Sequence, residues 1–361
     1  MNWRERILAR FSGEGDESPL YLPDLSLWYE WHRSQETLPP EWLDCSLPDV
    51  ARLMGVPVWL PIQPWLLELE GVEVHTIEES GERRIEIETR AGRLQTRWSL
   101  GPDGDWWRVE YPVKSKADLP AALELVKARS YSLDDTAVKR TWAMVGQDGV
   151  LALELPRRPF SELLHEILGW SDGLALLDEP MVLEMLIALE GRLQSLVHEI
   201  AALPGHLVLA PDNLDGQFIS PQAFERRLRD SYRLTARMLQ RNDKHLVVHV
   251  GGPGGHLLAP LAEAGVEGVE GVAGPPQGNS SLAQAREAAG PDLILWGGIA
   301  QDYLMEARPR EEFEAAVAEA VTQARGDRRI ILGVADRVPT QAELDRLQAL
   351  PELIDRAWQN A

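Results

Sequence analysis

The sequence predicts a single (β/α)8 barrel, an α/β fold of the TIM-barrel class, as one domain over residues 1–361. From about residue 118 onward, short β-rich runs alternate with helical patterns, which is the order of repeated βα units. Several of these runs, such as HLVVHV and LILWGGI, are almost continuously apolar, as parallel strands buried on both faces are. A hydrophobic content of 44% over 361 residues suits one barrel with insertions.

The expected strands and helices follow in chain order. A first barrel strand is expected at Pro19–Asp24. Later strands are expected at Gly149–Leu155, His206–Asp212, Lys244–Val250, Gly265–Val272, Asp292–Ile299 and Arg329–Ala335. Helices are expected from Ser161, over Pro180–Ala201, and from Ser220 to about Gln240, where Pro221 takes the first helical position.

The segment from about residue 72 to residue 113 departs from this order. It alternates apolar and polar residues in short bursts such as VEVHTIE and RRIEIETR. Turn residues separate the bursts at Ser80-Gly81, Ala91-Gly92 and Pro102-Asp103-Gly104. The pattern predicts an antiparallel β-meander inserted near the N-terminal end of the barrel.

Composition excludes several classes of function. The chain has 57 acidic and 36 basic residues, and its net charge of -21 would repel nucleic-acid phosphates and anionic lipid surfaces. The single cysteine, Cys45, excludes an internal disulfide and a site built from several thiolates. The charged start MNWRERILARF has no apolar signal core, and no run reaches the roughly 18 apolar residues that span a bilayer. We expect a cytoplasmic protein that binds neither nucleic acid nor membrane.

Polar residues at the ends of the predicted strands are the candidates for chemistry, because barrel active sites form at the C-terminal ends of the strands. These residues are Asp24, Glu154, Asp212, Asn213, His249, Glu270 and Asp336. Such a ring of carboxylates with one histidine can bind a metal, act as general acid and base, or hold a cationic or hydroxylated substrate. Each residue also has an ordinary structural interpretation: Asp212 and Asn213 as turn formers, His249 as a core histidine, and Asp336 as a helix cap or partner of Arg337.

An aromatic group could complete a substrate pocket near Asp24. Trp28 and Trp31 stand in the segment WYEWHR, and Trp296 stands in the strand LILWGGI. His32 and Arg33 would add hydrogen-bond donors to such a pocket. The alternative is that these residues belong to the core or to the surface of a rim helix.

Several segments together resemble the uroporphyrinogen decarboxylase superfamily, which includes cobamide-dependent methyltransferases. The likeness is in the opening RERILARFSGE, in VEYPVKSKADLPAAL, in RRPFSELLHEILGW, in DNLDGQFISPQAFERRLRDSYRLTARML, and in the strand ends VVHVGGP, LILWGGI and ILGVADRVP. No one of these segments is diagnostic, but they occur in the family's order and spacing. The resemblance implies a (β/α)8 barrel with its cleft at the strand C-termini.

The departures from the family narrow the function. The region LSLWYEWHRSQETLPPEW has Arg33 as its single arginine, where uroporphyrinogen decarboxylases carry an arginine-rich stretch for the porphyrin carboxylates. Family members that activate thiols bind zinc through a histidine and two cysteines. His249 fits that histidine, but Gly251 stands at the first cysteine position and ILGVAD contains no cysteine. A thiolate zinc site is therefore not expected.

What remains resembles the methyltransferases and demethylases that move a methyl group from a small methylated substrate to a separate corrinoid protein. On this interpretation His249 with Glu270, Glu154 or Asp336 acts as the acid or binds zinc or another divalent metal. Asp212 and Asn213 orient the substrate. The cobamide is carried by the partner protein, because the chain has no DxHxxG corrinoid motif.

Two alternatives stay open. The first is a decarboxylase or other lyase that acts on a small carboxylated substrate, with Arg33, Arg157 or Arg158 as carboxylate partners. The second is a ligand-binding barrel without catalytic activity. The resemblance suggests a monomer or a homodimer, and fold analogy alone does not choose among the reactions.

Overall fold

The computed structural model describes residues 1–101, 106–171 and 173–360, and contacts within the chain divide it into two units. Unit 1 comprises Met1–Ile62, Asp135–Leu155 and Ala201–Ala361, and unit 2 comprises Gln63–Asp134 and Pro156–Ile200. In the described ranges no helix is both long and apolar enough to cross a membrane. Unit 2 is larger than the expected meander. The single domain expected over residues 1–361 stays a prediction.

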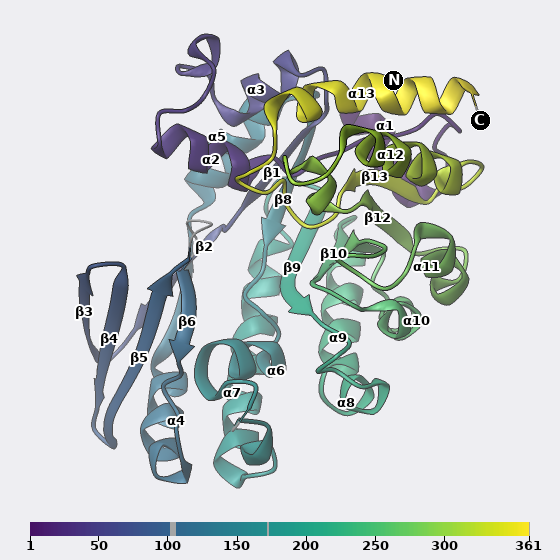
Figure 1. Ribbon diagram of the computed structural model, residues 1–361. Coiled ribbons are helices and arrows are strands. Elements are labelled where there is room, and N and C mark those ends of the chain that lie inside the picture. Colours follow the sequence, from purple (N-terminus) through teal and green to yellow (C-terminus); the bar gives the residue numbers. More distant parts are fainter. Residues whose placement is uncertain (102–105, 172, 361) are drawn as a thin grey trace. The chain divides into compact units, whose positions relative to one another are not determined.

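Unit 1 is built on a sheet of seven parallel strands that neighbour one another in chain order (Figure 1). The strands are β1 (Val58–Ile62), β8 (Gly149–Glu154), β9 (Leu207–Leu214), β10 (His245–Val250), β11 (Gly268–Val272), β12 (Ile294–Ile299) and β13 (Ile330–Val334). Parallel strands in sequential order, each followed by helices, are the arrangement of a TIM barrel. The six later strands lie where the sequence predicted them.

The first predicted strand is present as a short segment beside β13. Leu22 N–H donates to the Leu332 carbonyl, and Leu332 N–H donates to the Leu20 carbonyl, both at 2.8 Å. In the described residues no backbone ladder connects this segment to β1, so the sheet is TIM-barrel-like but not closed. The prediction of a closed (β/α)8 barrel is corrected to this extent.

β1 is the strand of this parallel sheet that sequence analysis did not find. Its sequence VWLPI contains Pro61, and Pro57 precedes it. Proline lacks a backbone N–H and is tolerated mainly on edge strands. β1 pairs with β8 alone, so the open side of the sheet accommodates Pro61.

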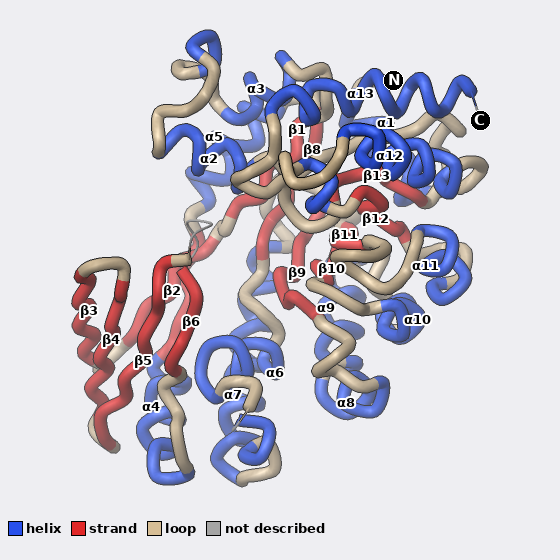
Figure 2. Tube along the Cα trace, viewed as in Figure 1, coloured by secondary structure: helices blue, strands red, loops and turns tan. Residues whose placement is uncertain are grey.

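The helices of unit 1 pack against this sheet, and Figure 2 shows them in blue around the red strands. They are α1 (Trp3–Ser12), α2 (Ser26–Ser34), η1 (Pro40–Trp42), α3 (Leu47–Leu53), α5 (Asp135–Val145), α8 (Pro221–Arg227), α9 (Arg229–Gln240), η5 (Gly255–Leu257), α10 (Leu258–Glu263), α11 (Leu282–Ala289), η6 (Gln301–Leu304), α12 (Arg310–Ala324) and α13 (Leu344–Asn360). Ser220 caps α8 by accepting from Ala223 N–H at 3.1 Å, as its position before Pro221 suggested. The helix expected from Ser220 to Gln240 is interrupted at Leu228 and forms α8 and α9.

The interior of the sheet is a continuous apolar cluster to which successive strands contribute alternate residues. Such pairs are Val150 with Ala152, Leu207 with Leu209, and Ile294 with Trp296. Ile7 and Phe11 of α1 belong to the same cluster. This alternation fixes which residues at the strand ends face inward.

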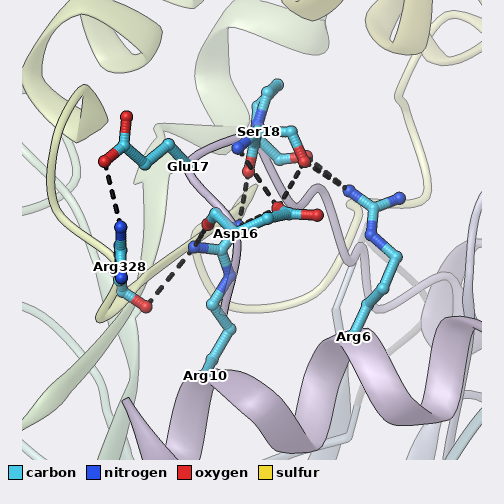
Figure 3. A network of polar contacts seen from close by, with 7 residues as sticks. Arg6, Arg10, Asp16, Glu17, Ser18 and Arg328 are labelled. Atoms are coloured by element: carbon cyan, nitrogen blue, oxygen red, sulfur yellow. Dashed lines mark hydrogen bonds and ion pairs between the residues drawn. The ribbon is translucent and has the colours of Figure 1, made fainter. Parts of the chain in front are cut away.

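A polar network ties α1 to the loops before the first strand segment and before β13 (Figure 3). Arg10 is 3% exposed and donates to the carbonyls of Asp16, at 2.7 Å, and of Ser18. It also donates to the Arg328 carbonyl at 3.4 Å, and Arg6 donates to the Ser18 hydroxyl at 3.0 Å. The network lies beside the N-terminal ends of the strands. Active sites of this fold form at the opposite ends, so we assign these polar contacts to stability.

Unit 2 contains the predicted antiparallel meander as a four-stranded sheet. Its strands are β3 (Glu73–Glu79), β4 (Glu82–Thr89), β5 (Gly92–Leu100) and β6 (Trp106–Glu110). Ser80 and Gly81 both have positive φ, 53° and 78°, which is the geometry of a type I′ hairpin turn. The turn expected at Pro102-Asp103-Gly104 lies outside the described residues.

The rest of unit 2 consists of helices and a second sheet of two strands, β2 (Trp65–Leu69) and β7 (Arg129–Leu133). The helices are η2 (Lys116–Asp118), α4 (Leu119–Ala128), α6 (Pro159–Glu162), the π-helical turn η3 (Leu163–Leu168), η4 (Gly173–Leu176) and α7 (Pro180–Ile200). One buried apolar cluster joins α4 and α7 to Ile87 of β4 and Leu94 of β5. Unit 2 therefore has its own core. The helix expected from Ser161 is the short α6 followed by η3.

Candidate active site

The interior alternation of unit 1 continues into polar residues at the C-terminal ends of the strands. Two residues beyond the cluster members Leu22, Ala152 and Val247 stand, in the same order, Asp24, Glu154 and His249. Side chains two residues apart on a strand point to the same face. Asp24, Glu154 and His249 are therefore placed on the interior side, as sequence analysis required of site residues.

His249 and Glu270 form the centre of the site. They are paired across β10 and β11, so their side chains emerge next to each other on one face. The distance from His249 Nδ1 to Glu270 Oε2 is 2.5 Å. On the other side of the ring, His249 Nε2 lies 3.9 Å from Asp336 Oδ1. The imidazole is thus flanked by two carboxylates.

These carboxylates control the protonation of His249. Burial by itself lowers the pKa of His249, but the charges of Glu270 and Asp336 outweigh it and raise the pKa to about 9. Burial also raises the pKa of Glu270. At neutral pH His249 is an imidazolium whose Nδ1–H is held by Glu270. Its Nε2–H remains the proton that can be transferred to a substrate.

Asp336 is held in an uncommon backbone conformation just beyond β13. Its φ is 64°, in the left-handed region that non-glycine residues seldom adopt. Its Oδ1 accepts from Arg337 N–H at 2.8 Å and lies 3.8 Å from Arg337 Nε. Burial raises the pKa of Asp24 and the carboxylates raise that of His249, and the charge of Arg337 opposes both rises. Arg337 is therefore a cation of the site that sequence analysis treated only as a partner for Asp336.

Asp24 occupies a polar niche beside two tryptophans. Its carboxylate accepts from Ser26 N–H at 2.9 Å, from Ser26 Oγ at 2.5 Å and from Trp59 Nε1 at 3.1 Å. Burial nevertheless raises the pKa of Asp24. Trp296 packs edge to face on Trp59 at 4.5 Å and donates from Nε1 to the Leu22 carbonyl at 2.9 Å. Trp296, predicted to bind substrate, is 2% exposed and forms part of the interior wall.

Trp59 contacts Asp24 but is not among the residues that sequence analysis assigned to substrate binding. It belongs to β1, the strand whose prolines obscured the pattern. Gly333 of β13 shows how tightly the wall is packed, because a Cβ at that position would lie 2.8 Å from Trp296 Nε1. A signal was nevertheless present in the sequence, since a tryptophan between Val58 and Leu60 fits a buried strand.

The structure separates Asp212 from Asn213. Asp212 is fully buried and accepts from the Tyr232 hydroxyl of α9 at 2.5 Å, in the layer between strand and helix. Asn213 has a positive φ of 49° and lies against Gly251, where an added Cβ would come within 1.7 Å of Asn213 Oδ1. We therefore leave Asp212 out of the proposed chemistry and keep Asn213, which lies near the end of β9 beside Gly251.

The side chains of α2 that were predicted to line an aromatic pocket contact other parts of the chain. Trp28 is 2% exposed and donates from Nε1 to the Ala342 carbonyl at 3.2 Å. His32 contacts the Thr340 carbonyl through Nε2 at 2.9 Å. Arg33 lies over the Tyr29 ring at 5.9 Å. Trp28 and His32 hold the chain around residues 340–342, and substrate binding by Trp28, Trp31, His32 and Arg33 stays a prediction.

The predicted metal ligands are adjacent but do not form a ligand set. In the described part of the chain, no group of three or more His, Cys, Asp or Glu side chains is arranged to hold a metal ion. Glu270 bonds directly to His249 Nδ1, which is the contact of a proton partner and not of a second ligand spaced around an ion. As they lie, His249, Glu270 and Asp336 do not fit a three-ligand zinc site.

Comparisons with known proteins support the fold. No family model and no curated protein matches the sequence. The solved structure of a methyltransferase from Methanosarcina mazei superposes with a TM-score of 0.62 at 15% identity, covering 99% of each chain. A D-psicose 3-epimerase from Clostridium cellulolyticum H10 gives a TM-score of 0.38 at 13% identity, covering 63% of this chain and 84% of the other. At these identities the first likeness shows a shared fold along the whole chain, and the second is too weak to support an argument.

Proposed function

We propose that this chain is a methyltransferase or demethylase that moves a methyl group from a small methylated substrate to a cobamide carried by a separate corrinoid protein. The observation that carries the proposal is the His249–Glu270 pair at the strand ends, with a 2.5 Å contact and a His249 pKa raised to about 9. The fold shared with a methyltransferase over the whole chain, and the resemblance to the uroporphyrinogen decarboxylase superfamily, support it. The substrate and the partner belong to the proposal.

The chemistry requires an acid. A reduced cobamide on the partner protein would supply the nucleophile for the methyl group. The bond between the methyl carbon and its heteroatom breaks, and the heteroatom keeps the electron pair. His249 donates its Nε2 proton to that heteroatom, and general acid catalysis of this kind contributes roughly 100- to 10,000-fold in rate.

The neighbours of His249 have separate tasks. Glu270 fixes the ring through Nδ1 and stabilises the imidazolium before transfer. Asp336, whose carboxylate lies 3.9 Å from Nε2, adds a second negative charge that stabilises the imidazolium, and the spent ring takes up its next proton from solvent. Glu154 ends β8, Asn213 lies near the end of the neighbouring strand β9, and both are assigned to orienting the substrate. Asp24 and Trp59, which are hydrogen-bonded to each other, form the wall of the site on the interior face of the sheet.

The test is a methyl-transfer assay with the full chain and chemically reduced cobalamin as acceptor. A panel of O-, N- and S-methylated compounds is supplied, and methylcobalamin formation is followed by its absorbance. We expect at least one substrate to be turned over, and His249→Gln to reduce that rate by 100-fold or more. Turnover that releases CO₂ without any corrinoid would replace this proposal by the lyase alternative.

The lyase alternative receives less support from two of the three arginines named for it, Arg157 and Arg33. Arg157 donates to Glu166 Oε1 at 3.0 Å, so it already has a carboxylate partner within unit 2. Arg33 is stacked over Tyr29. We therefore keep methyl transfer as the proposed function.

A further inference from the structure

A groove on unit 2 has no part in the proposed function. It lies between β7 and α7 and has a volume of about 380 Å³. Ser130 and Tyr131 line it from β7, and residues from Ile187 to Glu199 line it from α7. Sites for small molecules in proteins typically measure roughly 300–1,000 Å³, so the groove is large enough for one.

The floor of the groove is bare backbone at Gly191. This glycine stands in the interior of the 21-residue helix α7, where glycine costs about 1 kcal/mol relative to alanine. A Cβ at Gly191 would meet no atom within 4 Å, so packing in the described chain does not require glycine there. A glycine at such a position leaves the helix backbone open to the close approach of a ligand.

The walls beside Gly191 are apolar. Ile187, one turn before the glycine, is 74% exposed, although isoleucine is among the residues most often buried. Ala188, Leu196 and the ring of Tyr131 complete this part of the lining. An apolar body lying over Gly191 would cover Ile187 and remove its exposed surface from water.

The polar end of the groove is a cation with no carboxylate partner. Arg192 donates to the carbonyls of Ala188, at 3.0 Å, and Lys127, at 2.5 Å. These bonds hold the guanidinium in place and leave other N–H donors available. Within the residues that the structure describes, Arg192 forms no ion pair, although the chain has 57 acidic residues. Glu199, which also lines the groove, is seven residues further along α7, a rise of roughly 10 Å along the helix axis.

The charge of Arg192 reaches the opposite wall of the groove. Burial raises the pKa of the Tyr131 phenol, while the charges of Arg129 and Arg192 lower it. Arg192 and Tyr131 therefore lie close enough to act on one ligand group. A fixed guanidinium beside an apolar surface is suited to a carboxylate or similar oxyanion attached to a hydrocarbon.

We propose that this groove binds a small amphipathic anion, with its apolar body over Gly191 and its acidic group at Arg192. The occupant is an aromatic or aliphatic carboxylic acid of a size that 380 Å³ accommodates. The site is independent of methyl transfer, since it is built entirely within unit 2.

The test uses 8-anilinonaphthalene-1-sulfonate, an aromatic sulfonate that becomes fluorescent in apolar sites, titrated into the full chain. We expect saturable binding that Gly191→Leu, which fills the groove, weakens tenfold or more. Arg192→Met keeps most of the side-chain stem but removes the charge, and is expected to weaken binding by a similar factor. His198→Leu, which adds a leucine to an exposed position of α7 outside the groove, is the matched control and should leave binding unchanged.

Competition identifies the ligand chemistry. Octanoate should displace the probe, and octanol, which has the same chain without the charge, should displace it much less. Circular dichroism and thermal unfolding check that each variant is folded, and leucine at an exposed helical position favours folding relative to glycine. Affinity unchanged in both Gly191→Leu and Arg192→Met, equal weakening in His198→Leu, or equal displacement by octanol would each overturn the proposal.

Discussion

Two partly buried histidines, one in each unit, have opposite protonation behaviour. His249 lies between Glu270 and Asp336, and its pKa is raised to about 9. His165, on the π-helical turn of unit 2, has its pKa lowered to about 4 by burial and by the charges of Arg157 and Arg108. Burial lowers the pKa of both rings, so the sign of the neighbouring charge decides the outcome. His249 is a charged proton donor at neutral pH, and His165 is a neutral ring packed on Trp170 at 4.9 Å.

Removing the charge of Glu270 should have the largest effect on this contrast. Glu270→Gln keeps an acceptor for Nδ1 but removes the charge that outweighs burial, so we expect the pKa of His249 to fall by about 2 units or more. NMR titration of the His249 ring measures the shift. Methyl transfer at pH 7 should fall, with its pH optimum displaced to acid. An unchanged His249 pKa would show that Glu270 does not charge the ring.

The second prediction concerns stability in acid. The folded pKa of His165, about 4, lies below its ordinary value of 6.5, so the unfolded chain takes up a proton that the folded chain does not. Stability that is present above pH 6.5 is therefore lost as the pH falls towards 4, by up to about 3 kcal/mol. His165→Phe should remove this loss. Urea unfolding of wild type and variant at pH 7 and pH 4.5 compares the two.

The contribution of His249 to stability depends on pH in the opposite direction. Its folded pKa is raised, so its contribution to stability is present below pH 6.5 and is lost as the pH rises through about 9. His249→Gln should reduce the loss of unfolding free energy at alkaline pH. It should leave unchanged the loss at acid pH that we assign to His165. If both histidine variants change stability in the same pH range, the opposite pKa shifts assigned to His249 and His165 are wrong.

Replacing Asp336 should change His249 less than replacing Glu270. Its Oδ1 is 3.9 Å from Nε2, whereas Glu270 is 2.5 Å from Nδ1. We expect Asp336→Asn to lower the pKa of His249 by about 1 unit, on the same NMR titration. A larger shift than that of Glu270→Gln would make Asp336 the main counter-ion.

The smallest effect is expected from the cations near His165. Burial is the largest cause of its low pKa, and Arg157 contributes less. Arg157→Met should therefore raise the pKa of His165 by only a fraction of a unit, measured by NMR. Arg93→Met, at an exposed arginine paired with Glu86 and Glu88, is the control and should leave His165 unchanged.

Much of the fold could be predicted because its signals are local. Apolar runs such as the one before His249 are visible without any tertiary information, and the meander between residues 72 and 113 has strict alternation and marked turns. β1 was missed because Pro61 is a local signal against a strand, and only the open edge of the sheet explains why it is tolerated. The break between α8 and α9 also had no clear local signal.

The candidate site was predictable in position and less so in detail. The rule that barrel chemistry lies at strand C-termini placed His249, Glu270 and Asp336 together, and the structure brings them together. It could not show that Asp212 turns to Tyr232, because adjacent residues of a strand face opposite sides and the register is set by pairing. Arg337 and Trp59 were not assigned to the site for the same reason, since their neighbours are distant in sequence.

The sequence by itself determined the order of βα units, the antiparallel meander and the polar residues that close the strands, because these depend on periodicity and on turn residues within a few positions. Only the tertiary structure decided that the sheet stays open beside β1 and that His249 is charged while His165 is neutral. Protonation depends on burial and on the sign of charges a few ångströms away. Strand pairing and helix packing bring those charges from elsewhere in the chain, so the folded molecule assigns each histidine its chemistry.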